Sequence, residues 1–305
     1  MEQRELNVVT GASGFTGRYI ARRLLALGKA VRSLTGHPER PSPFGDQVQT
    51  VPFNFGRPDE LANNLRGATT LYNTYWVRFP HGKVTYGGAV QNTRTLLRAA
   101  EEAGVRRLVH ISITNPSEDS PLPYFRGKAL VESAIIQSSL SYAIIRPTVI
   151  FGPEDILINN LAWFLRRFPL FPVAGSGNYR VQPVCVDDVA EQAVRAAHDT
   201  ANIVMDAVGP DTYSYNELIR LIAAKVHSKA RTVHVRPGLM LFLARCSGYL
   251  VKDVVLTKDE LTGLMQGLLV SASPPTGSTS LGEWLEDHGD TVGSRYASEM
   301  ARHFR

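Results

Sequence analysis

The stretch Thr10-Gly11-Ala12-Ser13-Gly14-Phe15-Thr16-Gly17 (TGASGFTG, residues 10–17) decides the fold class. It follows an apolar run, LNVVT (residues 6–10), and opens a segment with helical periodicity, FTGRYIARRLLALG (residues 15–28). A short β-branched run, a glycine-rich turn and an amphipathic helix form the first half of a βαβ unit. This order predicts a strand, a tight turn and a helix at the start of the chain.

The three glycines of this turn, Gly11, Gly14 and Gly17, have two interpretations. In a nucleotide cradle, they permit the tight turn, the approach of a diphosphate and the close packing of helix on strand. Free N–H groups at the positive helix end then hold the diphosphate. The other interpretation is an ordinary glycine-rich turn, and the position between strand and helix favours the cradle. Three more residues of the turn are expected to border the nucleotide: Ser13, Phe15 and Thr16.

Short apolar runs and helical patterns alternate over the first two-thirds of the chain. Further strands are expected at residues 30–35, 48–53, 69–75, 106–112 and 141–147, and helices at 59–67, 89–104 and 126–139. Such alternation is typical of right-handed βαβ units with helices on both faces of a sheet. We therefore expect an α/β protein with a Rossmann-type doubly wound parallel sheet.

The rest of the chain is mostly helical in pattern. Helices are expected at residues 159–168, 187–198, 213–226, 237–251, 258–269 and 280–289, and a strand at 203–208 that returns to the sheet. Asp187 or Asp188 is the expected N-cap of the second of these helices. The sequence thus predicts a nucleotide-binding domain over residues 1–154, joined again by 181–208. A smaller, mostly helical substrate-side region covers 155–180 and 209–305.

Composition excludes several classes of protein. Of the 305 residues, 44% are hydrophobic and 20% charged, which is ordinary for a globular protein and argues against disorder. The net charge of +5 comes from scattered basic residues, so no nucleic-acid groove is expected. Cys185 and Cys246 stand far apart outside any Cys/His cluster, which predicts neither a disulfide framework nor a metal site.

The charged start of the chain and its apolar segments bear on location. Residues 1–6 (MEQREL) run directly into the first strand with no signal peptide, so a cytoplasmic protein is expected. The most apolar stretch, Pro237 to Val251, contains Arg245 and is too short to span a bilayer. We expect a core or interface helix there and do not expect it to associate with a membrane surface.

The end of the second strand indicates which nucleotide is bound. An NAD site usually has an acidic residue at this strand tip, bound to the ribose 2′-hydroxyl. Here the tip has none, since residues 34–40 read LTGHPER. Arg18, His37 and Arg40 can instead surround a 2′-phosphate, which favours NADP over NAD. For Arg40, plain surface placement is the alternative.

Four later motifs accompany the TGxxGxxG form: Asn92–Leu97 (NTRTLL), Tyr124–Lys128 (YFRGK), Arg146–Pro153 (RPTVIFGP) and Val184–Ala190 (VCVDDVA). Over residues 6–210 this set resembles the extended and atypical members of the short-chain dehydrogenase/reductase superfamily. The most similar subgroup holds NmrA-like regulators, sugar-nucleotide epimerase-like proteins and the nucleotide-binding accessory subunit of respiratory complex I. In the RPTVIFGP segment, the resemblance places Pro147 and Thr148 near the nicotinamide.

The resemblance implies a proton relay at the YFRGK motif. Tyr124 and Lys128 are four residues apart and share a helix face. The Lys128 ammonium would lower the pKa of the phenol, which makes Tyr124 the general acid/base, and Lys128 would also hold the nicotinamide ribose. The alternative is a structural tyrosine at a helix start and a solvated lysine.

Other positions follow from the resemblance. Active members place a Ser or Thr at the end of the fifth strand, where Ser112 and Thr114 are the candidates but Ile113 holds the usual position. Residues Asn54 and Phe55 correspond to the adenine contact. Two residues border the cofactor at the fourth strand: Asn73 and Thr74. The aromatic and basic loop at residues 75–81 either covers a substrate or is a packed turn.

Two functions are compatible with these motifs. The first is an NAD(P)(H)-dependent oxidoreductase or epimerase-like enzyme acting on a small molecule that the sequence does not identify. The second is a non-catalytic NADP(H)-binding sensor or assembly protein, which the residue Ile113 favours. The oligomeric state is open, and a homodimer through the helices around the fifth strand is the family's common form.

Overall fold

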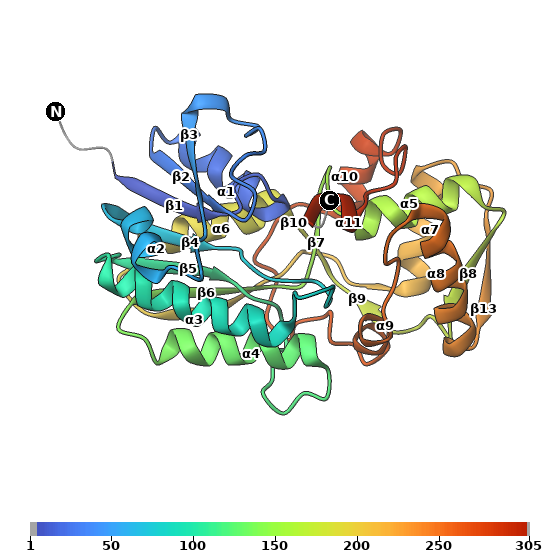
Figure 1. The fold of residues 1–305 in the computed structure, drawn as a ribbon. Coiled ribbons are helices and arrows are strands. Elements are labelled where there is room, and N and C mark those ends of the chain that lie inside the picture. Colours follow the sequence, from blue (N-terminus) through green and yellow to red (C-terminus); the bar gives the residue numbers. More distant parts are fainter. Residues whose placement is uncertain (1–4, 304–305) are drawn as a thin grey trace. The chain divides into compact units, whose positions relative to one another are not determined.

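A computed structural model describes residues 5–303 of the chain. Within these residues the chain forms two compact units: 5–147 with 187–207, and 148–186 with 208–303. Figure 1 shows the elements of both units in the order of the sequence. We describe each unit by itself.

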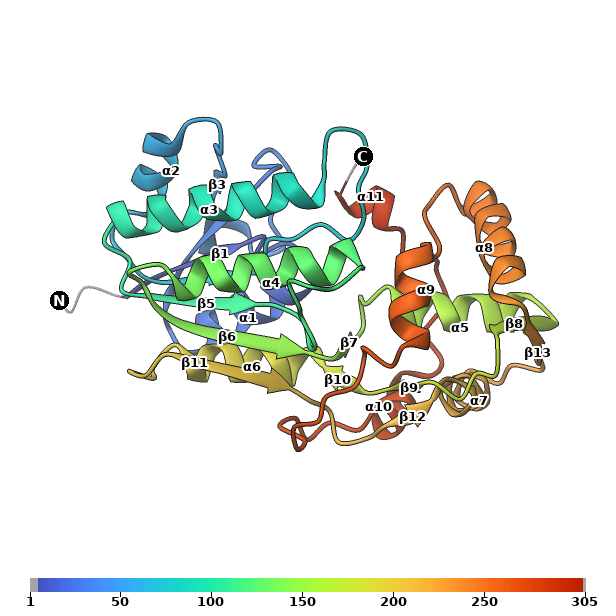
Figure 2. The same cartoon turned by 90° about the horizontal axis from the view of Figure 1, so that it is seen from below.

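The first unit contains a parallel sheet with helices on both faces. In the described part of the chain its strands number seven: β1 (Leu6–Thr10), β2 (Ala30–Thr35), β3 (Val48–Pro52), β4 (Ala68–Asn73), β5 (Arg107–Ile111), β6 (Ser141–Pro147) and β11 (Ile203–Ala207). Its helices are α1 (Phe15–Ala26), α2 (Pro58–Leu65), α3 (Tyr86–Glu102), α4 (Pro123–Ile136), α6 (Val186–Ala196) and the short 3₁₀ turn η1 (Gly45–Gln47). Helices α3 and α4 lie on one face, and α1 and α6 on the other (Figure 2).

The strand order makes the sheet doubly wound. It runs β11-β6-β5-β4-β1-β2-β3, and every pair of neighbours is parallel. The chain therefore moves outward in one direction from β1 and in the other from β4. Open sheets of this kind bind ligands outside the carboxyl ends of the strands where the order reverses, here β1 and β4. The predicted fold class is confirmed.

Burial on both faces explains the apolar strands of this unit. Leu71, Leu108 and Ile144 are fully buried at the centre of β4, β5 and β6. They pack with Leu96 of α3 and Val131 of α4 in one core cluster. Parallel strands covered on both sides read as continuous apolar runs, which is why the sequence predicted them.

The second unit has a core of its own. Its strands form pairs: β7 (Val149–Phe151) with β10 (Pro183–Cys185), β8 (Leu170–Ala174) with β13 (Arg231–Val235), and β9 (Arg180–Val181) with β12 (Tyr213–Ser214). Its helices are α5 (Leu157–Arg167), α7 (Tyr215–Lys225), α8 (Pro237–Val251), α9 (Lys258–Met265), α10 (Leu281–His288) and α11 (Glu299–His303). The core includes Phe151, Leu218, Ile222 and Leu285.

Three details differ from the expectations. Helix α8 is not a core helix, since Ala244 is its one buried residue among those described. Asp187 and Asp188 lie in the first turn of α6 and not at its N-cap, because the helix already begins at Val186. The strands β8 and β13 were not predicted, because each pairs with a single, distant partner. Across residues 5–303, no helix is long and apolar enough to cross a membrane.

The closest approach in the first unit lies between α1 and the turn before it. A methyl group at Gly17 would lie 2.2 Å from the carbonyl oxygen of Gly11 and 2.9 Å from its carbon. Those atoms are backbone and cannot rotate away. Only glycine allows α1 to start this close to the end of β1.

We predict that Gly17→Ala lowers the free energy of unfolding by about 1–3 kcal/mol, because the backbone must shift to admit the methyl group. Gly87→Ala, in the first turn of α3, is the matched control, since nothing lies within 4 Å of its added methyl. That control should be neutral or raise stability by about 0.5–1 kcal/mol. Chemical denaturation measures both, and equal effects would contradict the close approach.

Candidate cofactor site

The turn between β1 and α1 is shaped as a cradle for a diphosphate. Gly11 has a φ of +68°, and its N–H donates to the Leu34 carbonyl at 2.7 Å. The Gly14 N–H donates back to the Gly11 carbonyl at 2.8 Å, and Gly14 caps α1. The first turn of α1 contains no acidic residue, so no carboxylate of this turn competes with a bound diphosphate for its N–H groups. Ser13 lies in the turn, and Phe15 and Thr16 begin α1; their contact with the nucleotide stays a prediction.

The turn is closely packed on itself. A methyl at Gly14 would approach the Gly11 carbonyl oxygen to 3.1 Å, so glycine is favoured at this position too. The Ala12 N–H donates to the hydroxyl of Ser33 on β2 at 3.2 Å. The cradle is thereby tied to β2 as well as to β1.

A chain of polar side chains crosses the sheet where the strand order reverses. The Thr10 hydroxyl donates to the Asn73 amide oxygen at 3.2 Å and accepts from the Thr74 N–H at 2.7 Å. The Asn73 amide nitrogen donates to Nδ1 of His110 at 3.1 Å. Asn73 and Thr74 thus end β4 beside the cradle strand, as predicted, and Asn73 links it to β5.

His110 was not among the predicted site residues. It is completely buried, and burial together with the nearby Lys128 charge keeps its pKa well below the usual value. The ring is therefore neutral, and its Nδ1 accepts from Asn73, which leaves the proton on Nε2. The signal in the sequence was a histidine inside the apolar run RLVHI (residues 107–111).

Lys128 is buried on α4 behind the carboxyl end of β5. Its side chain donates to the Ile111 carbonyl at 3.0 Å, and the residue is 3% exposed. Burial lowers the pKa of Lys128 to about 7, against the opposing charge of Glu132. The predicted solvated lysine of the structural alternative is therefore wrong.

An aromatic cluster surrounds Tyr124, one turn before Lys128 on α4. The Tyr124 ring lies edge-on to Trp76 at 5.9 Å and to Tyr86 at 6.0 Å between ring centroids. The Trp76 ring also covers the Lys128 ammonium at 5.0 Å. A methyl at Gly127 would come within 2.7 Å of the Trp76 ring, so glycine is what lets the ring lie there. The loop at residues 75–81 therefore packs over the start of α4.

Three buried polar atoms near Lys128 lack a protein partner within residues 5–303. They are Trp76 Nε1, His110 Nε2 and Ser112 Oγ. A buried polar atom without a hydrogen bond costs about 1–3 kcal/mol and is rare in native proteins. A bound ligand or water with several polar groups would supply the missing partners, which fits a site for a polar cofactor or substrate.

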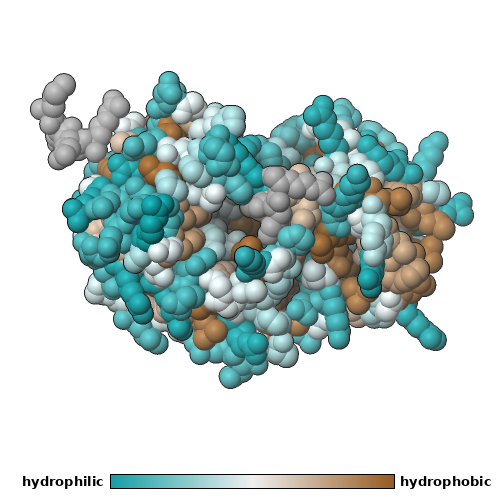
Figure 3. All heavy atoms as spheres, viewed as in Figure 1, coloured by the Kyte–Doolittle hydropathy of each residue, from teal (hydrophilic) through white to brown (hydrophobic). Residues whose placement is uncertain are grey.

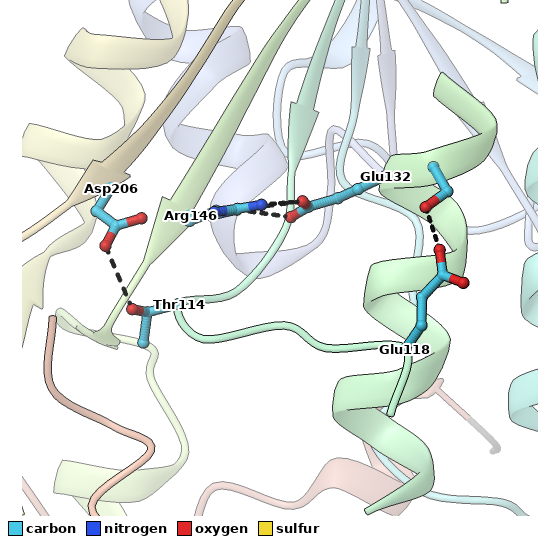
Figure 4. A network of polar contacts seen from close by, with 6 residues as sticks. Thr114, Glu118, Glu132, Arg146 and Asp206 are labelled. Carbon is cyan, nitrogen blue, oxygen red and sulfur yellow. Dashed lines mark hydrogen bonds and ion pairs between the residues drawn. The ribbon is translucent and has the colours of Figure 1, made fainter. Parts of the chain in front are cut away.

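Ser112 and Thr114 point to different surroundings. The Ser112 N–H donates to the Ile145 carbonyl at 2.7 Å, which extends β5 beside β6. The Thr114 hydroxyl is fully buried and donates to Asp206 of β11 at 3.5 Å (Figure 4). The Thr114 N–H donates to the Pro147 carbonyl at 3.0 Å. Thr114 therefore faces β6 and β11, and Ile113 is half-buried between the two hydroxyl residues.

An ion pair holds α4 against β6. Glu132, one turn after Lys128, accepts from the Arg146 guanidinium at 3.0 Å from Nε (Figure 4). The Glu132 side chain is 4% exposed. Because Tyr124, Lys128 and Glu132 are spaced by one turn, this pair also fixes the face of α4 that carries the first two.

The turn after β2 lies at the same sheet edge as the cradle, because Gly11 bonds to Leu34. His37 stands 3.4 Å from the Glu39 carboxylate, and the Arg40 N–H donates to the His37 carbonyl. On α1, the Arg18 guanidinium donates to the Ser13 carbonyl at 3.2 Å. The three predicted phosphate ligands therefore follow β1 and β2 at one edge.

The predicted adenine contacts follow β3. Asn54 has a φ of +50°, and its amide nitrogen donates to Glu60 at 2.7 Å. The ring of Phe55 stacks on Phe53 at 4.8 Å and lies 5.2 Å from the Tyr75 ring. Of the two residues predicted near the nicotinamide, Pro147 ends the first unit. Thr148 begins the second unit, where its hydroxyl is buried without a partner among the described residues.

The buried Lys128 predicts a pH dependence of stability. Between pH 7 and the usual lysine pKa of 10.5, the unfolded chain binds one more proton here than the folded chain. The free energy of unfolding should therefore rise with pH in this window, by at most about 1.4 kcal/mol per pH unit. In Lys128→Met the free energy of unfolding should no longer rise with pH in this window. In Lys83→Met, a change at an exposed lysine, the rise should remain. Urea unfolding from pH 7 to 9.5 measures the slopes, and equal slopes would refute it.

The sequence of this chain is similar to those of several known proteins. Residues 11–155 match a family model described as NAD(P)H-binding. The chain is 26% identical over 282 residues to NADH dehydrogenase [ubiquinone] 1 alpha subcomplex subunit 9, mitochondrial, of Arabidopsis thaliana, which covers 86% of this chain and 70% of that protein. It is 28% identical over 248 residues to ceramide reductase of Caulobacter vibrioides, with 78% and 76% covered.

Among solved structures, the NADPH-dependent quinone oxidoreductase QOR2 of Escherichia coli, in complex with NADPH, has the same fold. Its TM-score is 0.73 at 18% sequence identity, and the match covers 92% of this chain and 99% of that one. The fold of this chain thus has a counterpart in a protein whose structure contains NADPH.

Proposed function

We propose that the chain is an NAD(P)(H)-dependent oxidoreductase or epimerase-like enzyme of the extended and atypical short-chain dehydrogenase/reductase superfamily, which the NAD(P)H-binding region and the two relatives support. One observation carries the proposal: Tyr124 lies one turn from a buried Lys128 on α4, in the unit that contains the glycine cradle. The substrate is a small molecule of unidentified class.

The roles of the residues follow from their chemistry. The cradle at residues 11–17 binds the diphosphate through backbone N–H groups. The bound nicotinamide supplies the site for hydride transfer. Tyr124 donates or accepts the proton at the substrate oxygen, and the Lys128 ammonium orients the ribose and favours the phenolate. Asn73 and His110 hold the ends of β4 and β5 in place beneath this site.

We test the enzymatic role with Tyr124→Phe. This change removes the phenol but keeps the ring, so turnover should fall by about 10²–10⁴-fold while NADPH affinity stays the same. Tyr86→Phe is the matched control, because its ring belongs to the same cluster and its hydroxyl donates to the Arg78 carbonyl. Stopped-flow oxidation of NADPH with candidate carbonyl substrates measures the rate. Unchanged turnover in Tyr124→Phe would refute the role.

We propose NADP(H) as the preferred cofactor over NAD(H). The support is chemical: β2 ends without an acidic residue, and Arg18, His37 and Arg40 follow β1 and β2 at one sheet edge. A 2′-phosphate carries negative charge and accepts charge-assisted hydrogen bonds from such groups.

The cofactor preference is tested with Arg40→Gln. Loss of a charged hydrogen bond costs about 1.5–3 kcal/mol, so NADPH affinity should fall at least tenfold while NADH affinity is unchanged. Arg98→Gln, at an exposed residue of α3, is the control and should alter neither affinity. Isothermal titration of both nucleotides measures this, and a tenfold preference of the unaltered protein for NADH would overturn the proposal.

A second function is favoured by the aromatic cover. Trp76 lies over Lys128, and Ile113 stands where active relatives place a hydroxyl. A non-catalytic protein that binds NADP(H), as a sensor or within an assembly, would need neither an uncovered Lys128 ammonium nor a hydroxyl at position 113. The relative from Arabidopsis is named as a subunit of a larger complex, which supports this version. Binding of NADPH without turnover by any metabolite tested would favour it.

The cytoplasm is the location we propose. Cys185 is buried and Cys246 exposed, and both are free thiols. Free thiols are typical of proteins in reducing compartments. Determination of the thiol state in intact cells by alkylation tests this, and an oxidised Cys246 would contradict it.

A further inference from the structure

Helix α8 exposes an apolar surface in the second unit. Four large side chains are far more exposed than is usual for their kind: Leu239 at 48%, Phe242 at 61%, Tyr249 at 72% and Leu250 at 78%. Figure 3 shows apolar side chains gathered on the right of that view, where Figure 1 labels α8, β8 and β13. Contiguous exposed apolar surface of this kind marks an interaction site.

These side chains form one stripe along the helix. Leu239, Phe242, Cys246 and Tyr249 are spaced by three, four and three residues, which places them on one helix face. Leu250 follows directly beside this stripe. The opposite face meets the second unit through Ala244 and the contact of α8 with β8. We call this stripe, with Leu250, the α8 stripe.

The charged residues of α8 and of the segment that precedes it have one sign. Residues 218–252 contain no Asp or Glu, and their Lys and Arg residues are Arg220, Lys225, Lys229, Arg231, Arg236, Arg245 and Lys252. Arg231, Arg236 and Arg245 are exposed. Within residues 5–303, Arg236 and Arg245 form no ion pair. A partner for this surface therefore combines an apolar interior with negative charge at its rim.

We propose that the α8 stripe docks the second unit on an anionic lipid surface, with α8 lying in the plane of the membrane interface. The helix has 15 residues and is about 22 Å long, too short for a hydrocarbon core of about 30 Å. Leu239, Phe242 and Leu250 enter the acyl boundary, and Tyr249 suits the headgroup level. The Arg side chains extend their charged ends to the phosphates.

Other occupants fit less well. In a symmetric dimer through α8, Arg236 and Arg245 of one copy would meet the same basic surface of the other. An acidic protein would satisfy the charges, but Tyr249 and Leu250 are 72% and 78% exposed, so they stand out from the surface that a folded partner would have to match. A fluid bilayer accepts projecting side chains without a matching pocket. This proposal departs from the expectation that the segment does not associate with a membrane surface.

The chain provides its own probe for the test. Cys246 lies on the α8 stripe and is exposed, while Cys185 is buried, so an environment-sensitive fluorophore can be attached at Cys246. With vesicles of phosphatidylcholine and phosphatidylglycerol, the emission should shift to the blue and become protected from aqueous iodide. Vesicles of phosphatidylcholine alone should bind much more weakly, and salt should reverse the binding.

Variants of the unlabelled protein separate the two contributions in vesicle flotation. Phe242→Ser combined with Leu250→Ser should abolish binding, while Leu27→Ser, at a comparably exposed site of the first unit, should not. Arg236→Gln and Arg245→Gln should each weaken binding to anionic vesicles about fivefold, the effect of one basic residue near such a surface. Circular dichroism should show all four proteins folded, since the changed side chains are exposed.

The opposite results would overturn the proposal. Absence of binding to anionic vesicles, or equal binding by the protein with and without Phe242 and Leu250, contradicts docking on lipid. A dimer in analytical ultracentrifugation that the double variant dissociates, with no vesicle binding, would assign the α8 stripe to contact between copies. Capture of an acidic protein by the stripe, again without vesicle binding, would equally refute the proposal.

Discussion

The contact between Gly17 and the Gly11 carbonyl is the constraint on which the first unit depends. It sets how closely α1 can start behind β1, and the Gly11 to Leu34 bond ties the same turn to β2. The position of the cradle at the reversal of strand order follows from these two contacts. The residues that are proposed to bind the nucleotide at the ends of β1, β2 and β3 are positioned relative to this turn.

A second set of contacts fixes the proposed reaction centre from the other side of the sheet. The Arg146–Glu132 pair holds α4 on β6, and Lys128 bonds to the end of β5. The Asn73–His110 bond then joins β5 to the cradle strands. Burial of these charges and polar groups is costly unless each has a partner, so the order of this region depends on these three contacts, while Trp76 Nε1, His110 Nε2 and Ser112 Oγ are left for a ligand or water.

The sequence predicted what local rules determine and missed what tertiary contacts determine. The β1–cradle–α1 unit follows from glycine spacing and apolar periodicity, and the seven-stranded sheet among residues 5–303 follows from repeated alternation. The burial of Lys128 and the role of His110 depend on neighbours far along the chain, such as Trp76 and Asn73. The exposure of α8 was missed because an apolar run reads the same in a core and at a surface.

The Trp76 ring lies over the Lys128 ammonium, where the proposed ribose site is. If the ring has to move before a ribose engages the ammonium, the apparent dissociation constant of the ribose is the intrinsic constant divided by the fraction of molecules with the ring moved. The adenine half, bound at the cradle and β2, is independent of this equilibrium. The binding free energy of a fragment that ends at the diphosphate therefore reports on the cradle alone. The difference between this value and the binding free energy of the whole dinucleotide includes the cost of moving the Trp76 ring.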